Sequence, residues 1–506
     1  MKIGDYYRNV LMPANSAVSA IRRVGLPVDL ARIRALRGEW LAEVADLEAF
    51  VEGEAAKAGA ALKYSDKHVA SREDLAAFLY GGLGLECLGE TETGLQSTDD
   101  AALMTYASLK VPRETDHPVV RAVLQIRSLS GAVTRYLDSF ERTRRSDGCC
   151  HPRFNWALRT ARLSAEDPPV HQIPERADLR VADAVKSCIV PRVAPAPDPA
   201  EWDPRKHGSC IRWDIKGAEA AIRAAMLTHR FCSRPDPVAW EYLRMGKDIH
   251  SKTASLIYGV PEGTFGKGTH ERDSVGKPTF FAKQFGATWG TVQRTVWETA
   301  RVWLKTEEAM RVSDNFDAGY SGLTELYEID KRLLAERGYC EDAYGRRRHI
   351  PVPADPSKYE LAHAQHVMAN TPTQSTNATD NVWMIALCYH GEYVSLRVPP
   401  MWEHLGVPFP EAAGWRLHGG PGPDGPLLAW HMNTVHDSGW ADSAPGRHLE
   451  SAAKVIWRRC HAVPLDWRIE ADVPYRIDLM CGPDMSRLRP YNDVAREFGL
   501  EPMPKR

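Results

Sequence analysis

The spacing of apolar residues predicts two helix-rich regions separated by a stretch of loop. Apolar side chains recur three and four positions apart across residues 15–60, with charged residues on the opposite face, as in an amphipathic helix. Residues 111–140 show the same period behind a proline-bearing start, and residues 248–370 are largely helical in pattern, broken by glycine-rich turns. Residues 145–205 are rich in proline, so we expect a loop or linker between these regions.

Short apolar runs predict strands, and two of these runs border an aspartate. Residues 208–217 predict a short buried strand that ends at Asp214, and strand-like residues around 427–441 flank His436 and Asp437. A late strand is expected over residues 462–473. Carboxylates on adjacent strands can hold two Mg²⁺ ions about 3.5–4 Å apart. Taken singly, however, an aspartate in such a position is more often a cap or turn residue than a metal ligand.

Composition and charge narrow the possible settings and partners. The chain has 506 residues, 43% hydrophobic and 26% charged, with no apolar run long enough to cross a bilayer and no signal-peptide pattern at its start. Its ten cysteines form no CxxC motif, which favours reduced thiols and a cytoplasmic protein, in the host cytoplasm if the source is viral. The net charge of −2 excludes a global basic field, so a nucleic acid would have to be bound by local runs such as residues 141–148 and 345–349.

An ordered series of motifs resembles the polymerase module of family A DNA polymerases, the DNA polymerase I family. The resemblance extends from about residue 10 to about residue 475. Its motifs, in chain order, are RFN (153–155), TARLSAEDP (160–168), HQIP (171–174), DIKGAE (214–219), DIHSKTASLIYGVP (248–261), GKPTFFAKQFGATWG (276–290), GYCEDAYGRRRHIP (338–351), TPTQSTNATD (371–380) and VHDS (435–438).

The resemblance implies an α+β fold with a right-hand architecture. Residues 1–150 would form a helical thumb with an N-terminal helical segment, and residues 236–370 helical fingers. The palm, with a mixed sheet, would combine residues 151–235 and 371–506, with an insertion near 390–428 that has no family counterpart. We expect a compact, phage-like monomer that touches no membrane and has no room for a proofreading or 5′-nuclease domain.

The resemblance also implies the reaction. A DNA-directed DNA polymerase adds deoxynucleotides from deoxynucleoside triphosphates to the 3′ end of a primer on a DNA template, by two-metal phosphoryl transfer. Asp214 and Asp437 would hold two Mg²⁺ ions, for which Mn²⁺ can substitute, with the backbone carbonyl of Ile215 as a further ligand. Lys277 would meet the incoming triphosphate and count with the aspartates as catalytic.

Other family positions would surround the incoming nucleotide. Phe281 and Phe285 follow Lys277 at four-residue spacing, which places all three on one face of a helix. His250 would reach the phosphates. Arg272 precedes Lys277 by five residues where the family has four, and five residues rotate too far for one α-helical face unless the helix begins between them.

Glu219 would lie under the sugar and exclude a ribose 2′-hydroxyl, the group that separates RNA from DNA substrates.

Further positions would contact DNA. Arg162 and Gln374 would donate to the minor-groove edge at the primer terminus, where acceptors are alike for all base pairs, so pair geometry is checked without reading sequence. Arg346 and Arg347 would contact the template or its phosphates, and His436 would lie near the primer end.

Departures from the family pattern keep two alternatives open. Ser438 stands where the family usually has a second carboxylate, and HDS at 436–438 is typical of single-subunit, phage-type RNA polymerases, whereas Glu219 favours DNA. A DNA-binding homologue without catalysis is suggested by Ser438 and the shifted Arg272 and disfavoured by the retained Asp214 and Asp437. The remaining departures are Ile215 for Tyr, Ala221 for Arg, Phe285 for Tyr and His171-Gln172 for Gln-Asn.

Overall fold

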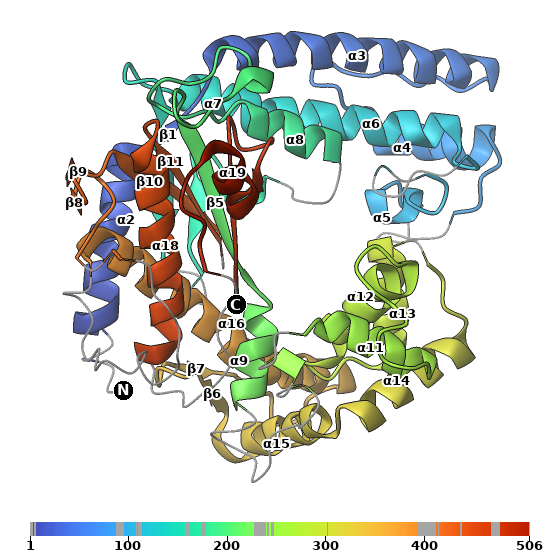
Figure 1. Ribbon diagram of the computed structural model, residues 1–506. Helices are drawn as coiled ribbons and strands as arrows, with labels where there is room; N and C mark the ends of the chain where they lie inside the picture. The colour runs from blue at the N-terminus through green and yellow to red at the C-terminus, as the bar shows by residue number, and fades with distance from the viewer. Residues whose placement is uncertain are drawn as a thin grey trace.

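A computed structural model describes the chain at residues 4, 7–87, 96–107, 109, 114–156, 162–173, 179–226, 239, 242–243, 247–300, 302–391, 411–412, 414–435, 438–466 and 476–504. These residues form an α+β fold, as predicted (Figure 1). In this view a pair of long helices lies at the top, a sheet with flanking helices lies at the left, and a second group of helices lies at the lower right. No described helix is long and apolar enough to cross a membrane.

The long-helix side is built around α3 (Leu30–Lys57) and α6 (Pro118–Ala132), which pack against each other. Asp29 caps α3, because its carboxylate accepts hydrogen bonds from the backbone of Ala31 and Arg32. The single helix predicted over residues 15–60 is wrong. α2 (Met12–Val24) ends at Gly25, whose φ of 72° suits glycine, and the short strand β1 (Leu26–Pro27) follows before α3.

The helical stretch predicted over residues 111–140 begins later than expected. Its described part consists of α6, a π-helical turn (Val133–Leu137) and α7 (Asp138–Thr143). Pro118 is at the start of α6, as the missing N–H of proline favours.

The central sheet has five strands in the order β10-β11-β5-β12-β13. Their bounds are β5 (Ser209–Lys216), β10 (Ala429–Val435), β11 (Ser438–Ser443), β12 (Arg476–Gly482) and β13 (Arg489–Pro490). Every pairing between these strands is antiparallel, where a mixed sheet was predicted. β5 was predicted to end at Asp214 but continues to Lys216. Ile211, Trp213 and Ile215 are buried on one face of β5, so Asp214 and Lys216 lie on the more open face.

The start of the late strand predicted over residues 462–473 is also wrong. α18 (Arg447–Asp466) continues through residues 462–466, residues 467–475 lie outside the described part of the chain, and the next described strand, β12, is found from Arg476. Buried residues recur at helical spacing along α18, from Leu449 through Ile456 to Cys460, so the apolar pattern there belongs to a helix that packs on the sheet.

A 33-residue helix, α16 (Lys358–His390), joins the parts of the fold. Ser357 and Glu360 form a capping box at its start, and nearly every residue from Thr371 to Cys388 is buried. α16 packs against α2, α18, the helix after β5, named α9 (Ala218–Met226), and α15 (Ser321–Arg337). α2 also packs on β10, so the first helix lies with the sheet. The boundaries predicted at residues 150, 235 and 370 stay predictions.

The second helical group contains α11 (Ile249–Tyr258), α12 (Lys277–Lys283), α13 (Trp289–Ala300), α14 (Thr306–Gly319) and α15. Phe280, Phe316 and Tyr320 pack edge to face or tilted in its core. A hairpin of β6 (Tyr339–Glu341) and β7 (Arg347–His349) leads into α16. Of the predicted insertion, residues 392–410 lie outside the described residues, and β8 (Pro421–Gly422) pairs with β9 (Gly425–Pro426) near its end.

Candidate active site

Asp214 lies on the open face of the central strand, next to the strand that follows Asp437 in the sequence. Ser438, the first residue of β11, is the direct cross-strand partner of Asp214. Ser438 is buried, and its Oγ donates to the carbonyl oxygen of Val435 over 2.9 Å. His436 and Asp437 lie outside the described residues, so their roles stay predictions.

The carboxylate oxygens of Asp214 are suitable ligands for a hard divalent cation. Carboxylate oxygens are the ligands that Mg²⁺ prefers, and Asp214 is partly exposed on the open face. Among the described residues, no group of three or more His, Cys, Asp or Glu side chains is arranged to hold a metal ion, and Asp437 is not among them. The Ile215 side chain is buried on the opposite face, which leaves only its backbone for the predicted contact.

A π-helical turn accommodates the additional residue between Arg272 and Lys277. Residues Glu271–Gly276 form this turn, and the Lys277 N–H donates to the carbonyl of Arg272. Such i to i+5 bonds bring residues five apart to one side of the turn. α12 then begins at Lys277. The helix therefore starts between Arg272 and Lys277, which is the condition for both side chains to face the same ligand. A Cβ on Gly276 would approach the Ala254 Cβ to 2.9 Å, so glycine permits close packing of this turn on α11.

His250 on α11 lies beside both cations and two aromatic rings. Burial, and then the positive charge of Lys277, lower the pKa of His250 to about 4, and Arg272 acts in the same direction. The His250 ring centroid lies 5.2 Å from that of Phe281 and 5.6 Å from that of Phe280. Its buried Nδ1 makes no hydrogen bond within the described part of the chain. His250 is therefore neutral at pH 7 and offers a hydrogen bond rather than a charge.

Arg272 is held by the residue that caps α11. Its Nη2 and Nε lie 2.7 and 2.8 Å from Asp248 Oδ2, and Asp248 also accepts from the His250 backbone N–H. Burial opposes ionisation of Asp248, yet the hydrogen bond and charge of Arg272 keep its pKa below the usual range. The pair fixes the Arg272 guanidinium beside the histidine.

The two phenylalanines predicted on the face of Lys277 separate. Phe281 is 37% exposed on α12, whereas Phe285 is 6% exposed. α12 ends at Lys283, so Phe285 lies in the following turn, with its ring 6.4 Å from that of His366. The prediction of one shared helix face is wrong for Phe285, because four-residue spacing aligns side chains only while the helix continues.

Glu219 lies in the first turn of α9 and is paired with Arg162. The Arg162 Nη2 donates to Glu219 Oε1 over 2.8 Å, and both side chains are largely buried. The residues predicted to meet the sugar and the primer terminus are thus in direct contact. The spacing of their motifs, 57 residues apart, gave no sign of this pairing.

Arg223, also on α9, joins four parts of the fold and was missed by the sequence reading. This fully buried guanidinium lies 2.6 Å from Asp330 Oδ2 on α15. It also donates to the carbonyls of Gln284 and Ala369, and it lies 5.8 Å from the ring of Phe285. An arginine in the otherwise small and apolar run at 220–226 was the available signal.

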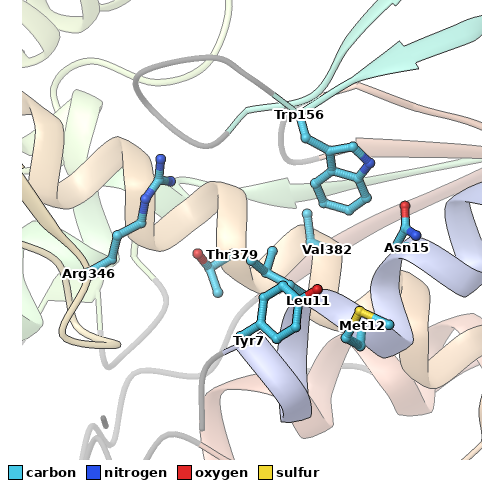
Figure 2. Close-up of a pocket in the computed structure, with 8 residues that line it drawn as sticks. All are labelled: Tyr7, Leu11, Met12, Asn15, Trp156, Arg346, Thr379 and Val382. Atoms are coloured by element: carbon cyan, nitrogen blue, oxygen red, sulfur yellow. The ribbon is translucent and has the colours of Figure 1, made fainter. Parts of the chain in front are cut away.

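Arg346 lines a pocket of about 290 Å³ beside the β6–β7 hairpin. Figure 2 shows the aromatic side chains of Tyr7 and Trp156 among the other lining residues, with Arg346 to one side. Arg347 is exposed and pairs with Glu341 over 2.8 Å, and Gln374 is partly exposed on α16. The structure thus separates the two adjacent arginines, of which Arg346 faces the pocket.

Comparisons with known proteins agree with these motifs. A family model for DNA polymerase family A matches residues 43–392. The chain is 28% identical over 379 residues to the thermostable DNA polymerase I of Thermus aquaticus, covering 74% of this chain and 40% of that protein. It is 26% identical over 316 residues to DNA polymerase I of Pseudomonas aeruginosa, covering 62% and 30%. The chain therefore spans less than half of the length of these relatives.

A solved structure shares the fold. It is described as the POL domain of Pol1 from M. smegmatis in complex with DNA primer-template and dNTP, and it covers 95% of this chain and 71% of its own at a TM-score of 0.70 and 19% identity. The family model alone spans most of the chain and includes the segments of Asp214, Glu219, Lys277 and Gln374. This chain belongs to DNA polymerase family A.

Proposed function

We propose that this protein is a DNA-directed DNA polymerase that extends a primer 3′ end with deoxynucleotides on a DNA template and releases pyrophosphate. The observation that carries the proposal is the position of Asp214, on the open face of the central strand and paired with the strand that follows Asp437. The resemblance of the motifs at residues 214–219 and 435–438 to the family pattern supports the proposal that both aspartates belong to one site.

Family A DNA polymerases use divalent metal ions, and we propose Mg²⁺ for this chain. Asp214 and Asp437 are the residues that would hold it, because both offer hard oxygen ligands. When bound, such ions neutralise phosphate charge and activate the attacking hydroxyl.

The cations of α12 and the preceding turn bind the triphosphate. Lys277 and Arg272 lie beside the same histidine, so both can meet one polyanion. His250 adds a neutral hydrogen bond, and the exposed ring of Phe281 offers a stacking surface for a base. This division of tasks uses charge for the phosphates and an aromatic face for the nucleobase.

Glu219 selects the sugar. A carboxylate beneath the sugar leaves no space for a 2′-hydroxyl, and Arg162 holds that carboxylate in place. This reading favours a DNA polymerase over the RNA polymerase that the HDS motif suggested. Arg162 and Gln374 would check the primer terminus, His436 would lie near it, and Arg346 and Arg347 would contact the template strand.

The proposal is tested by primer extension with Asp214→Asn. We expect wild-type protein with Mg²⁺ to extend a primed DNA template and the variant to be slower by on the order of a thousandfold, with primer-template binding retained. Asp493→Asn, on the exposed pair of Asp493 with Arg496, is the matched control and should extend at the wild-type rate. Normal extension by Asp214→Asn would contradict the proposal.

A further inference from the structure

Asp214 has a second direct cross-strand partner, Asp478 on β12. β5 lies between β11 and β12, so Asp214 is paired with Ser438 on one side and Asp478 on the other. Directly paired residues of antiparallel strands point to the same face, with Cβ atoms about 4.5–5.5 Å apart. Ser438, Asp214 and Asp478 therefore form one row across the sheet.

This row places two carboxylates side by side in the middle of a sheet. Like charges directly opposite one another destabilise paired strands. A cation bound between them would reverse that effect, since the attraction of each carboxylate to the ion replaces their mutual repulsion. Lys216 already supplies one positive charge through its pair with Asp478, and a cation bound between the two carboxylates would attract both of them.

The other end of the row lacks the charge that the family pattern places there. Ser438 is neutral, and its hydroxyl already donates to the Val435 carbonyl. With Ser438 in this position, the predicted aspartates would face two divalent cations without the usual third carboxylate. Asp478 adds a negative charge on the opposite side of Asp214, at the same register.

The Asp478 carboxylate is accessible on this face. Asp478 pairs with Lys216, which is also on the open face of β5, and their side chains are 44% and 43% exposed. Exposed ion pairs of this kind contribute little to the stability of the fold, because water and salt screen the two charges. Exchange of the Lys216 ammonium for a metal ion thus costs little.

We infer that Asp478 is a further acidic residue of the divalent-metal site and offsets the missing carboxylate at Ser438. The inference rests on the proposed function, because it takes the metal site to include Asp214. Asp478 would bind the cation directly or through a water molecule. The ion pair between Lys216 and Asp478 would break when the cation binds.

Manganese binding tests the inference without catalysis. Free Mn²⁺ is followed by electron paramagnetic resonance during titration of the full chain with primer-template and no nucleotide. We expect Asp478→Asn to weaken Mn²⁺ binding about 10- to 100-fold, as loss of a metal-supporting carboxylate does. Lys216→Gln is the matched control: it breaks the same ion pair but keeps Asp478, so its Mn²⁺ affinity should equal or exceed that of wild type.

A rescue variant separates metal binding from folding. Ser438→Glu in the Asp478→Asn background returns a carboxylate to the row and should recover most of the lost affinity. The inference is overturned if Asp478→Asn binds Mn²⁺ like wild type, or if Lys216→Gln weakens binding as much as Asp478→Asn. Primer extension by wild type is scored separately, so a protein that binds Mn²⁺ through Asp478 and extends no primer would contradict the proposed function alone.

Discussion

Arg162 and Glu219 form an ion pair, with the Arg162 Nη2 2.8 Å from Glu219 Oε1 and side-chain exposures of 22% and 20%. Arg162 lies two residues before β4 (Ser164–Glu166), so the pair joins the chain ahead of β4 to the start of α9. Arg162 is thereby a support for the carboxylate that we assign to sugar selection. A change at either residue should alter the same property.

Glu219→Ala should increase ribonucleotide incorporation, because the space beneath the sugar opens. Arg162→Met should increase it less, since the carboxylate remains but loses its partner, and the double variant should match Glu219→Ala. The measurement is the ratio of kcat/KM for a deoxynucleotide and the matching ribonucleotide. Arg142→Met, which breaks the exposed pair with Asp167, is the control; additive effects of Arg162 and Glu219 would contradict the support role.

The sheet should depend on a buried ion pair near the end of β11. Arg192 binds the fully buried Asp442 of β11 through Nε at 2.8 Å and Nη2 at 3.1 Å, and donates to the carbonyls of Val24 and Gly25. We expect Asp442→Ala to lower the free energy of unfolding by about 3–5 kcal/mol, because the guanidinium is left without its counter-charge.

The measurement is the free energy of unfolding in urea, taken from the first unfolding transition. Glu141→Ala, which removes the exposed partner of Arg34, is the control and should cost less than about 1 kcal/mol. Equal losses in the two variants would contradict the role of the buried pair.

Stability should fall as the pH decreases below 6.5. Burial lowers the pKa of His431 from 6.5 to about 3, so the unfolded chain takes up a proton that the folded protein refuses between these values. The contribution is complete above pH 6.5 and decreases towards pH 3; between pH 7 and pH 5 it amounts to about 2 kcal/mol. His431→Gln should reduce the pH dependence of the unfolding free energy by this amount. An unchanged slope would show that His431 titrates normally.

Arg346 should contribute a phosphate contact. Arg346→Gln is expected to weaken primer-template binding and to reduce the slope of log Kd against log salt concentration by about one. Arg348→Gln is the control within the same run, because the Arg348 Nη1 donates to Thr371 Oγ1 over 2.7 Å and serves the fold. Equal slopes for wild type and Arg346→Gln would contradict the proposed contact between Arg346 and a phosphate.

Sequence pattern predicted local features well where one periodicity held. The apolar run at residues 208–217 predicted the strand of Asp214, and the start of α12 at Lys277 meets the condition that the sequence analysis set for Arg272. The break at Gly25 was missed because the apolar pattern of α2 and α3 reads through it. Spacing alone could not reveal the π-helical turn that aligns Arg272 with Lys277.

Contacts between distant segments could not be predicted from one sequence. The Arg162–Glu219 pair, the buried Arg223–Asp330 pair and the pairing of Asp214 with Asp478 each depend on tertiary packing or strand register. The register of a strand can be predicted only when the residues on each of its faces are known. Because the late strand was predicted at other residues, the register of β12 could not be predicted. The part of the site made by Asp478 was therefore visible only in the structure.

The most direct test of the account compares the four deoxynucleotides with the four ribonucleotides in Mg²⁺-dependent extension of one primed DNA template by the wild-type protein. We predict template-directed extension with deoxynucleotides, preferred in kcat/KM by on the order of a hundredfold or more. A preference for ribonucleotides would establish the RNA polymerase alternative. No extension with either set, together with DNA binding by Asp437→Asn equal to that of wild type, would establish the inactive DNA-binding alternative.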